Sequence, residues 1–129
     1  MASDATILVV DDNRDNAEIL RSFLESRGYK VIQAFDGESA LARMEEVHPD
    51  LVLLDVMMPG MDGWQVCRTI KQHRDLAATR VVMVTAKGGW EDKHEGMRAG
   101  ADDYVVKPID LKEVEKKVER NLAAGGDAE

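Results

Sequence analysis

Five short runs of apolar, largely β-branched residues recur along the 129-residue chain, and longer stretches with apolar residues at helical spacing lie between them. The short runs predict β-strands, whereas apolar positions at i, i+3, i+4 and i+7 predict amphipathic helices. The predicted strands are Ile7–Val10, Lys30–Ala34, Leu51–Leu54, Arg80–Val84 and Tyr104–Val106. The first and third runs are apolar at every position, which indicates a parallel sheet covered by helices on both faces.

A predicted helix follows each strand, with one apolar stripe available to face the sheet. The clear stripes are Ala17, Leu20, Phe23 and Leu24; Ala40, Leu41, Met44 and Val47; Trp64, Cys67 and Ile70; and Leu111, Val114 and Val118. The helix predicted at Glu91–Ala99 has the weakest pattern, because it follows Gly88-Gly89 and contains Gly96. We expect Gly125-Gly126 to end the last helix. Five strands alternating with five helices predict a doubly wound α/β fold.

Length and composition narrow the class of protein. A chain of this size is expected to form a single domain over residues 1–129, with a core at about residues 5–122 and frayed ends. Its 25 Asp and Glu residues outnumber its 17 Lys and Arg residues, for a formal net charge of −8. This sign disfavours direct binding to nucleic acid. No run approaches the ~20 apolar residues of a membrane span. A single cysteine permits no internal disulfide, which favours a cytoplasmic location.

Polar residues of unusual kinds lie where the predicted strands end. Asp11 and Asp12 follow the first strand, Asp55 the third, Thr85 the fourth and Lys107 the fifth. The carboxyl ends of parallel strands share one edge of the sheet, and ligands bind there where the strand order reverses. In the common order 2-1-3-4-5 this reversal falls between the first and third strands, the two that end in acids. We therefore expect three carboxylates to converge in one crevice.

Converging carboxylates repel one another, and a bound cation relieves that repulsion. Oxygen ligands with no His or Cys nearby favour Mg²⁺ (or Mn²⁺) over zinc. Lys107 and Thr85 would bring a positive charge and a hydroxyl to the same edge, which predicts a site for a phosphoryl group. Taken alone, each residue has an ordinary interpretation, since an aspartate after a strand is commonly a helix cap. Pro108 makes a cis bond after Lys107 accessible, although trans is the more common isomer.

These residues, in this order, resemble the receiver domain of two-component response regulators. The resemblance runs from about Ile7 to Leu122 and rests on four motifs: Ile7–Asn13, Asp50–Gly63, Val82–Ala86 and Gly100–Pro108. It implies a flavodoxin-like sheet, similar to that of chemotaxis regulators. It also implies a signalling switch with slow self-catalysed phosphoryl chemistry, rather than a metabolic enzyme.

The resemblance implies a phosphoacceptor and a metal site. Asp55 would accept a phosphoryl group from a phosphohistidine on a histidine kinase or a histidine phosphotransfer protein. Asp12 and Asp55 would bind Mg²⁺ directly, Asp11 would bind it through water, and the backbone carbonyl of Met57 would complete the protein ligands.

The resemblance also assigns the residues around the phosphoryl group. Lys107 would pair with Asp55 before phosphorylation and with a phosphoryl oxygen afterwards, and Thr85 would donate to another oxygen. Tyr104 would turn inward when Thr85 moves, which changes the surface formed by the fourth helix, fifth strand and fifth helix. The side chains of Met57 and Lys87 would flank the water that hydrolyses the acyl phosphate.

The expected partners are a histidine kinase or phosphotransfer protein and a downstream protein target, with no membrane partner and with the chain itself a monomer or weak dimer. We expect no output domain after Leu122, as in a stand-alone receiver or a phosphorelay intermediate. A receiver excised from a hybrid histidine kinase or a longer response regulator would look the same.

Three rival functions remain to be weighed. A flavin-binding electron carrier would need a hydroxyl- and glycine-rich loop where this chain has Asp11–Arg14. A Mg²⁺-dependent phosphohydrolase with an aspartyl nucleophile usually has Asp-x-Asp after the first strand and a cap segment. A receiver that no longer accepts phosphate is disfavoured by the complete set of acids, Thr85 and Lys107.

Overall fold

The computed structural model describes residues 5–58, 60–85 and 100–127. Within these ranges the chain forms five strands and four helices. They are β1 (Thr6–Val10), α1 (Arg14–Ser26), β2 (Lys30–Ala34), α2 (Gly37–Val47), β3 (Leu51–Asp55), α3 (Gly63–Gln72), β4 (Arg80–Thr85), β5 (Asp103–Val106) and α5 (Leu111–Asp127). The helix predicted at Glu91–Ala99 lies outside the described residues, as does Lys87.

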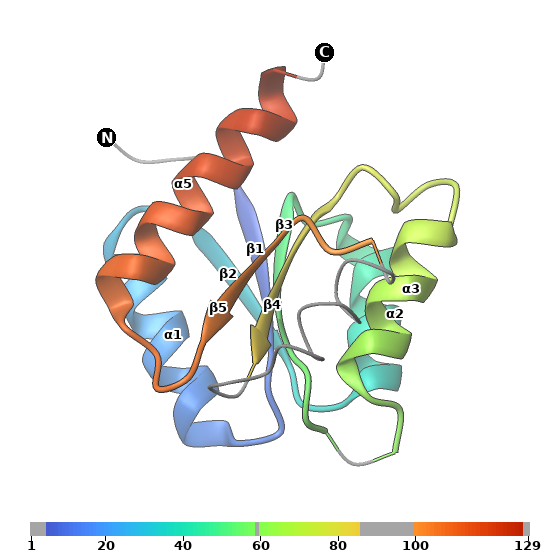
Figure 1. The fold of residues 1–129 in the computed structure, drawn as a ribbon, viewed down its shortest axis with the longest axis horizontal. Coiled ribbons are helices and arrows are strands. Elements are labelled where there is room, and N and C mark those ends of the chain that lie inside the picture. The colour runs from blue at the N-terminus through green and yellow to red at the C-terminus, as the bar shows by residue number, and fades with distance from the viewer. Residues whose placement is uncertain (1–4, 59, 86–99, 128–129) are drawn as a thin grey trace.

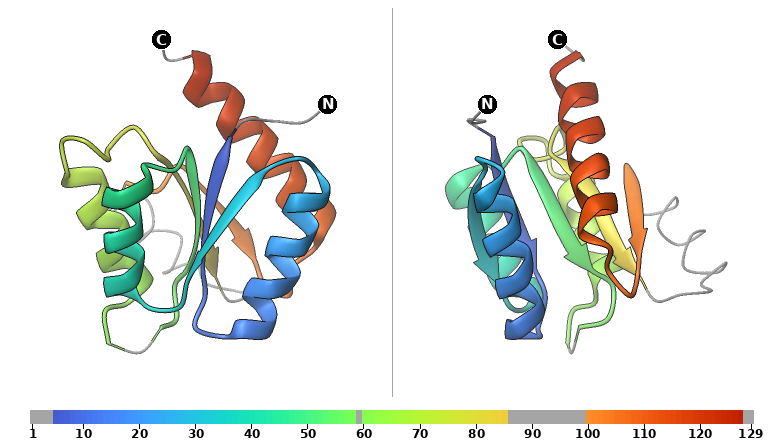
Figure 2. Two further views of the ribbon diagram at one scale, coloured as in Figure 1. Left: turned by 180° about the vertical axis from the view of Figure 1, so that it is seen from behind. Right: turned by 90° about the vertical axis from the view of Figure 1, so that its left-hand side faces the viewer.

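All five strands are parallel and hydrogen-bonded in the order β2-β1-β3-β4-β5. This confirms the predicted doubly wound sheet and places the reversal of strand order between β1 and β3. Helices cover both faces: α1 and α5 lie on one side of the sheet, and α2 and α3 on the other (Figure 1). The view from behind in Figure 2 shows α1 and α5 together again on one side.

Two apolar clusters, one on each face, hold the helices to the sheet. On the first face, Ile7 and Val9 of β1 pack with Leu20 of α1 and Val118 of α5. On the other, alternate residues of the same strands pack with α2 and α3. Each fully buried aliphatic side chain contributes about 1.5–3 kcal/mol relative to exposure. β1 and β3 are therefore anchored in the core along most of their length, and both end at the predicted crevice.

Polar caps begin the helices next to that crevice. The side chains of Asn13, Asp36 and Asp62 accept hydrogen bonds from backbone N–H groups in the first turns of α1, α2 and α3. Asp62 and Gln65 form a reciprocal capping box. These caps satisfy N–H groups that have no partner within the helix.

The element bounds differ from the predicted ones in a few places. Asp55 and Thr85 are the last residues of β3 and β4 rather than the residues after them, because they stay in register with Val84 and Val106. Val47 was predicted on a buried stripe, but it is 36% exposed. It is the last residue of α2, where the chain turns through His48 in the left-handed region.

α5 also differs from the prediction, because it continues through Gly125-Gly126 to Asp127 instead of ending at the two glycines. A glycine destabilises a helix by about 1 kcal/mol relative to alanine, but it does not forbid helical geometry. No helix within the described ranges has both the length and the apolar character needed to cross a membrane.

Candidate functional site

Three carboxylates meet at the edge of the sheet where β1 and β3 end. Asp11, Asp12 and Asp55 each offer a carboxylate oxygen within 4.8 Å of the others. Asp11 and Asp55 are each only 2% exposed, whereas Asp12 faces solvent. The structure thus brings together the three acids that the sequence placed in one crevice.

Backbone N–H groups fix the two buried carboxylates. The N–H of Asn13 donates to Oδ1 of Asp11 at 2.9 Å, and the N–H of Met57 donates to Oδ1 of Asp55 at 3.2 Å. The backbone of Asp11 is held as well, because its own N–H donates to the carbonyl of Ala34 at 3.2 Å. The acids are therefore placed by the strands and by the turns that follow them, before any ligand binds.

Electrostatics at this cluster favour a cation. Burial raises the pKa of Asp11 above its ordinary value, and the neighbouring Asp55 carboxylate raises it further; the Asn13 N–H and the Lys107 ammonium act in the opposite direction. Three carboxylates that offer only oxygen suit a hard divalent ion such as Mg²⁺. The residues present therefore fit the metal that the sequence led us to expect.

Lys107 reaches the same crevice from the end of β5. Its Nζ lies 3.3 Å from Oδ1 and 3.3 Å from Oδ2 of Asp55. Its backbone N–H donates to the carbonyl of Thr85 at 2.7 Å, which ties the end of β5 to the end of β4. The Lys107-Pro108 peptide bond is cis, the less common of the two isomers considered from the sequence.

The hydroxyl and the aromatic residue named for the switch lie on β4 and β5. Thr85 is buried at the end of β4. Tyr104 is paired with Met83, two residues before Thr85, so Tyr104 and Thr85 project from the same face of the sheet. Tyr104 is half-buried, and the Lys117 ammonium lies 5.0 Å from the centroid of its ring.

Of the two residues expected to flank the hydrolytic water, the structure describes Met57 but not Lys87. Met57 is 70% exposed, so its side chain stands at the solvent side of the crevice while its N–H contacts Asp55. Lys87 lies outside the described residues, and its place relative to Asp55 stays a prediction.

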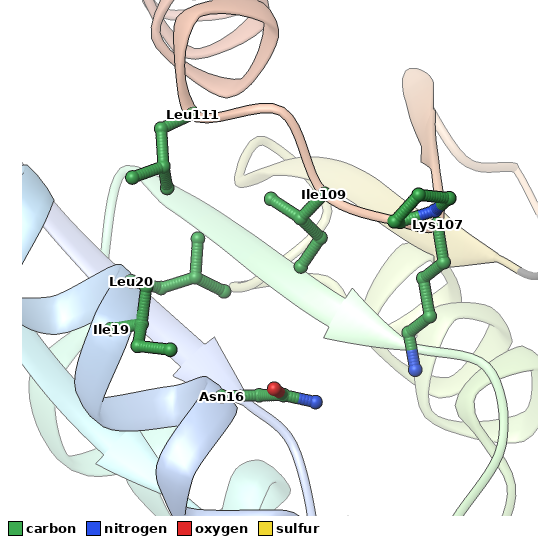
Figure 3. Close-up of a pocket in the computed structure, with 7 residues that line it drawn as sticks. Asn16, Ile19, Leu20, Lys107, Ile109 and Leu111 are labelled. Carbon is green, nitrogen blue, oxygen red and sulfur yellow. The ribbon is translucent and has the colours of Figure 1, made fainter.

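A cavity of about 320 Å³ opens beside Lys107, between α1 and the segment that joins β5 to α5 (Figure 3). It is lined by Asn16, Ile19, Leu20, Lys107, Pro108, Ile109 and Leu111. Most of these side chains are apolar, and Ile19 is 55% exposed. This cavity, an open groove beside Lys107, was not predicted from the sequence. The available signal was an apolar Ile19 outside the predicted buried stripe of its helix.

Comparison with known proteins relates this chain to a family. Residues 7–119 match the family described as response regulator receiver domain. The transcriptional regulatory protein ResD of Bacillus subtilis is 43% identical over 120 residues, which are 93% of this chain and 49% of that protein. The chain spans about half the length of the curated relatives it matches.

Solved structures agree with the match. A CheY-like response regulator receiver domain protein from Methanospirillum hungatei has a TM-score of 0.91 at 28% identity, covering 98% of this chain and 100% of that one. The receiver domain of a signal transduction histidine kinase from Syntrophus aciditrophicus has a TM-score of 0.87 at 33% identity, covering 93% of this chain and 91% of that one.

Proposed function

Because the chain belongs to the response regulator receiver domain family, we propose that Asp55 accepts a phosphoryl group from a phosphohistidine on a histidine kinase or histidine phosphotransfer protein. One observation carries the assignment to this residue. The buried Asp55 carboxylate has an oxygen within 4.8 Å of oxygens of Asp11 and Asp12, and it lies 3.3 Å from the Lys107 ammonium. This arrangement provides a nucleophile, a metal site and a positive charge at one point.

Phosphoryl transfer to Asp55 requires little beyond positioning of the reacting groups and neutralisation of the charge on the phosphoryl oxygens. A carboxylate oxygen of Asp55 forms a bond to phosphorus as the bond from phosphorus to the donor's imidazole nitrogen breaks. Lys107 offsets the negative charge that the phosphoryl oxygens bring into the crevice, and the Thr85 hydroxyl donates a hydrogen bond to one of them. The product is an acyl phosphate on Asp55.

The acid cluster supplies the metal site that this transfer needs. Asp12, Asp55 and the carbonyl of Met57 would hold Mg²⁺ directly, and Asp11 would hold it through water. A bound Mg²⁺ would screen the repulsion between the carboxylates and an incoming phosphoryl group. Burial is the main cause of the raised pKa of Asp11, and the Asp55 carboxylate adds to it; a bound cation would oppose both effects.

A change on the β4–β5 face follows from the added charge. A phosphoryl group carries nearly two negative charges and three strong acceptors. A Thr85 hydroxyl drawn toward it leaves space on the face that Tyr104 shares. Inward movement of the Tyr104 ring would alter the surface formed by β5 and α5. A downstream protein that binds either the phosphorylated or the unphosphorylated chain more tightly would then respond to phosphorylation.

The groove beside Lys107 supports docking of the phosphodonor. The donor must bring a phosphohistidine over Asp55 while the rest of its surface rests on neighbouring elements. Exposed Ile19 and the partly buried Ile109 and Leu111 offer an apolar surface next to the Lys107 side chain. An apolar face of a donor helix would bury these side chains and hold the reacting groups in place. The donor and the target stay proposals, as do a cytoplasmic location and a monomeric or weakly dimeric state.

Phosphorylation by a small donor tests the proposal without a partner protein. Wild-type chain and the Asp55→Asn variant are incubated with acetyl phosphate and Mg²⁺, and each is weighed intact by mass spectrometry. We expect the wild type to gain one phosphoryl group, and the gain to disappear when a chelator removes the metal. Asp55→Asn should gain none. Equal gain in both proteins would refute Asp55 as the acceptor.

A further inference from the structure

The connection between β3 and α3 starts at Asp55 and ends at Gly63, and its two ends touch. Gly63 is the first residue of α3. A Cβ atom at this position would lie 2.2 Å from the carbonyl oxygen of Asp55 and 2.8 Å from Cα of Val56. The N–H of Gly63 also donates to the carbonyl of Val56 at 3.0 Å. The first turn of α3 therefore rests directly on the backbone of the acceptor residue.

This contact leaves no room for a side chain at Gly63. Real Cβ atoms essentially never approach another heavy atom within 3.0 Å, and here the obstacle is backbone, which cannot rotate aside. A Cβ would force the start of α3 and the end of β3 apart by about 1 Å. Only a glycine allows the two backbones to lie as they do.

Packing elsewhere directs such a displacement toward Asp55. The next residues of α3 resist movement, because Trp64, Val66 and Cys67 are buried in the core. The connection is also closed at its other side: a Cβ on Gly37, the first residue of α2, would lie 2.9 Å from Cβ of Met61. Asp55 lies one residue beyond the part of β3 that pairs with β1 and is held by the ladder to β4 alone. The displacement that α3 does not take up therefore falls on this end of β3.

We propose that Gly63 is a positioning residue of the phosphoacceptor site. Its missing side chain fixes the Asp55 backbone, and with it the carboxylate that meets the Met57 N–H at 3.2 Å and the Lys107 ammonium at 3.3 Å. A shift of the backbone moves the nucleophile relative to both partners and to Asp11. This inference rests on the function proposed above, and it adds a residue that touches no reacting atom.

Two glycine-to-alanine variants separate positioning from general stability. Gly63→Ala introduces the clash. Gly60→Ala makes the same change in the same connection, where φ is +76° and nothing lies within 4 Å of the added Cβ. The control therefore adds backbone strain without a new contact. Urea unfolding gives the folded fraction of each protein, and the rate of phosphorylation by acetyl phosphate at saturating Mg²⁺ is expressed per folded molecule.

We expect Gly63→Ala to react at least about tenfold more slowly per folded molecule than the wild type, since a misplacement of ~1 Å can slow a reaction by ~100-fold. Gly60→Ala should stay within about twofold of the wild type, even where it unfolds more easily. A purely structural role for Gly63 would lower stability and leave this rate unchanged. Equal rates in the two variants would therefore overturn the inference.

Partial unfolding of Gly63→Ala is handled by adding trimethylamine N-oxide, which favours folded states, to all three proteins. If Gly63→Ala stays unfolded there while Gly60→Ala folds, Gly63 is needed for the fold itself and the positioning role is wrong. A wild-type chain that takes no phosphoryl group refutes the proposed function instead. The wild-type result and the variant result thus report on separate claims.

Discussion

The ammonium nitrogen of Lys107 is equidistant, at 3.3 Å, from the two carboxylate oxygens of Asp55. The two residues are 52 positions apart in the chain, and β4 lies between their strands in the sheet. Their meeting depends on the parallel topology, which delivers the ends of β3 and β5 to one edge. The Lys107 side chain is one third exposed whereas that of Asp55 is buried, so under the proposed function the ammonium is the partner that would move with a phosphoryl oxygen.

Replacing Lys107 with methionine should separate metal binding from phosphoryl transfer. The variant keeps a long apolar side chain but removes the positive charge beside Asp55. Mg²⁺ affinity should be unchanged or higher, because no cation competes with the ion for the acids. The rate of phosphorylation by acetyl phosphate should fall by about 10²–10³, the usual effect of removing one group that stabilises developing charge.

Calorimetry for Mg²⁺ and intact mass for phosphorylation measure these two effects. Lys112→Met, a change to an exposed lysine at the start of α5, is the matched control and should alter neither. An unchanged phosphorylation rate in Lys107→Met would show that the contact with Asp55 has no role in transfer.

Asp103 should make stability depend on pH in the acid range. Burial raises the pKa of Asp103, but hydrogen bonds from Arg120, Asn121, Lys117 and the Tyr104 N–H outweigh it and lower the pKa to about 2. A depressed pKa stabilises the folded state above the unfolded value of 3.8, and this stabilisation is lost as pH falls toward 2. Asp103→Asn should lower the free energy of unfolding at pH 7 by about 1–2 kcal/mol.

Urea unfolding from pH 7 down to pH 3 checks this dependence. The difference between wild type and Asp103→Asn should be constant above about pH 5 and should shrink steadily below pH 4. Asp75→Asn, at an exposed aspartate after α3, should show no such convergence. A difference that persists undiminished at pH 3 would mean that the charge of Asp103 is not the source of its effect.

Cys67 should be unreactive while the protein is folded. It is buried on α3, and burial raises the pKa of its thiol to about 11. Only the thiolate is nucleophilic, so access and ionisation both oppose reaction. At pH 8, iodoacetamide labelling followed by mass spectrometry should be negligible in buffer and complete in urea. Rapid labelling in buffer would show that α3 opens without global unfolding.

Ile19 should affect transfer from a protein donor but not from a small one. Ile19→Asp places a charge on the exposed apolar rim of the groove beside Lys107. With a histidine kinase that phosphorylates the wild-type chain, the rate of transfer should fall by about tenfold or more, because burying an unpaired charge opposes docking. The rate with acetyl phosphate should stay the same. An equal loss with both donors would indicate damage to the site rather than to docking.

The acid crevice was predictable because its residues are brought together by the order and direction of the strands. Two fully apolar strands imply a parallel sheet, and a parallel sheet brings the residues at strand ends to one edge. Asp11, Asp55 and Lys107 therefore followed from where the apolar runs stop. Val47 was misplaced because helical spacing predicts a stripe but not where the packed surface ends.

Contacts made by the backbone or by single long side chains could not be predicted from the sequence. Gly63 appears in the sequence only as the last residue of the Asp50–Gly63 motif, and nothing in its neighbours reveals how closely it approaches Asp55. Lys71 pairs with Asp102 at 2.8 Å and also donates to loop carbonyls, an arrangement that depends on tertiary geometry. The groove beside Lys107 depends in the same way on how α1 lies relative to the segment before α5.

Chemical trapping of the phosphorylated residue tests the central claim most directly. The chain is phosphorylated with acetyl phosphate and Mg²⁺ and reduced with borohydride, which converts an aspartyl phosphate to homoserine; peptide mass spectrometry then locates the change. We predict homoserine at position 55 and unmodified aspartate at positions 11 and 12. Homoserine at either of those positions, or at no acid of the crevice, would contradict the account.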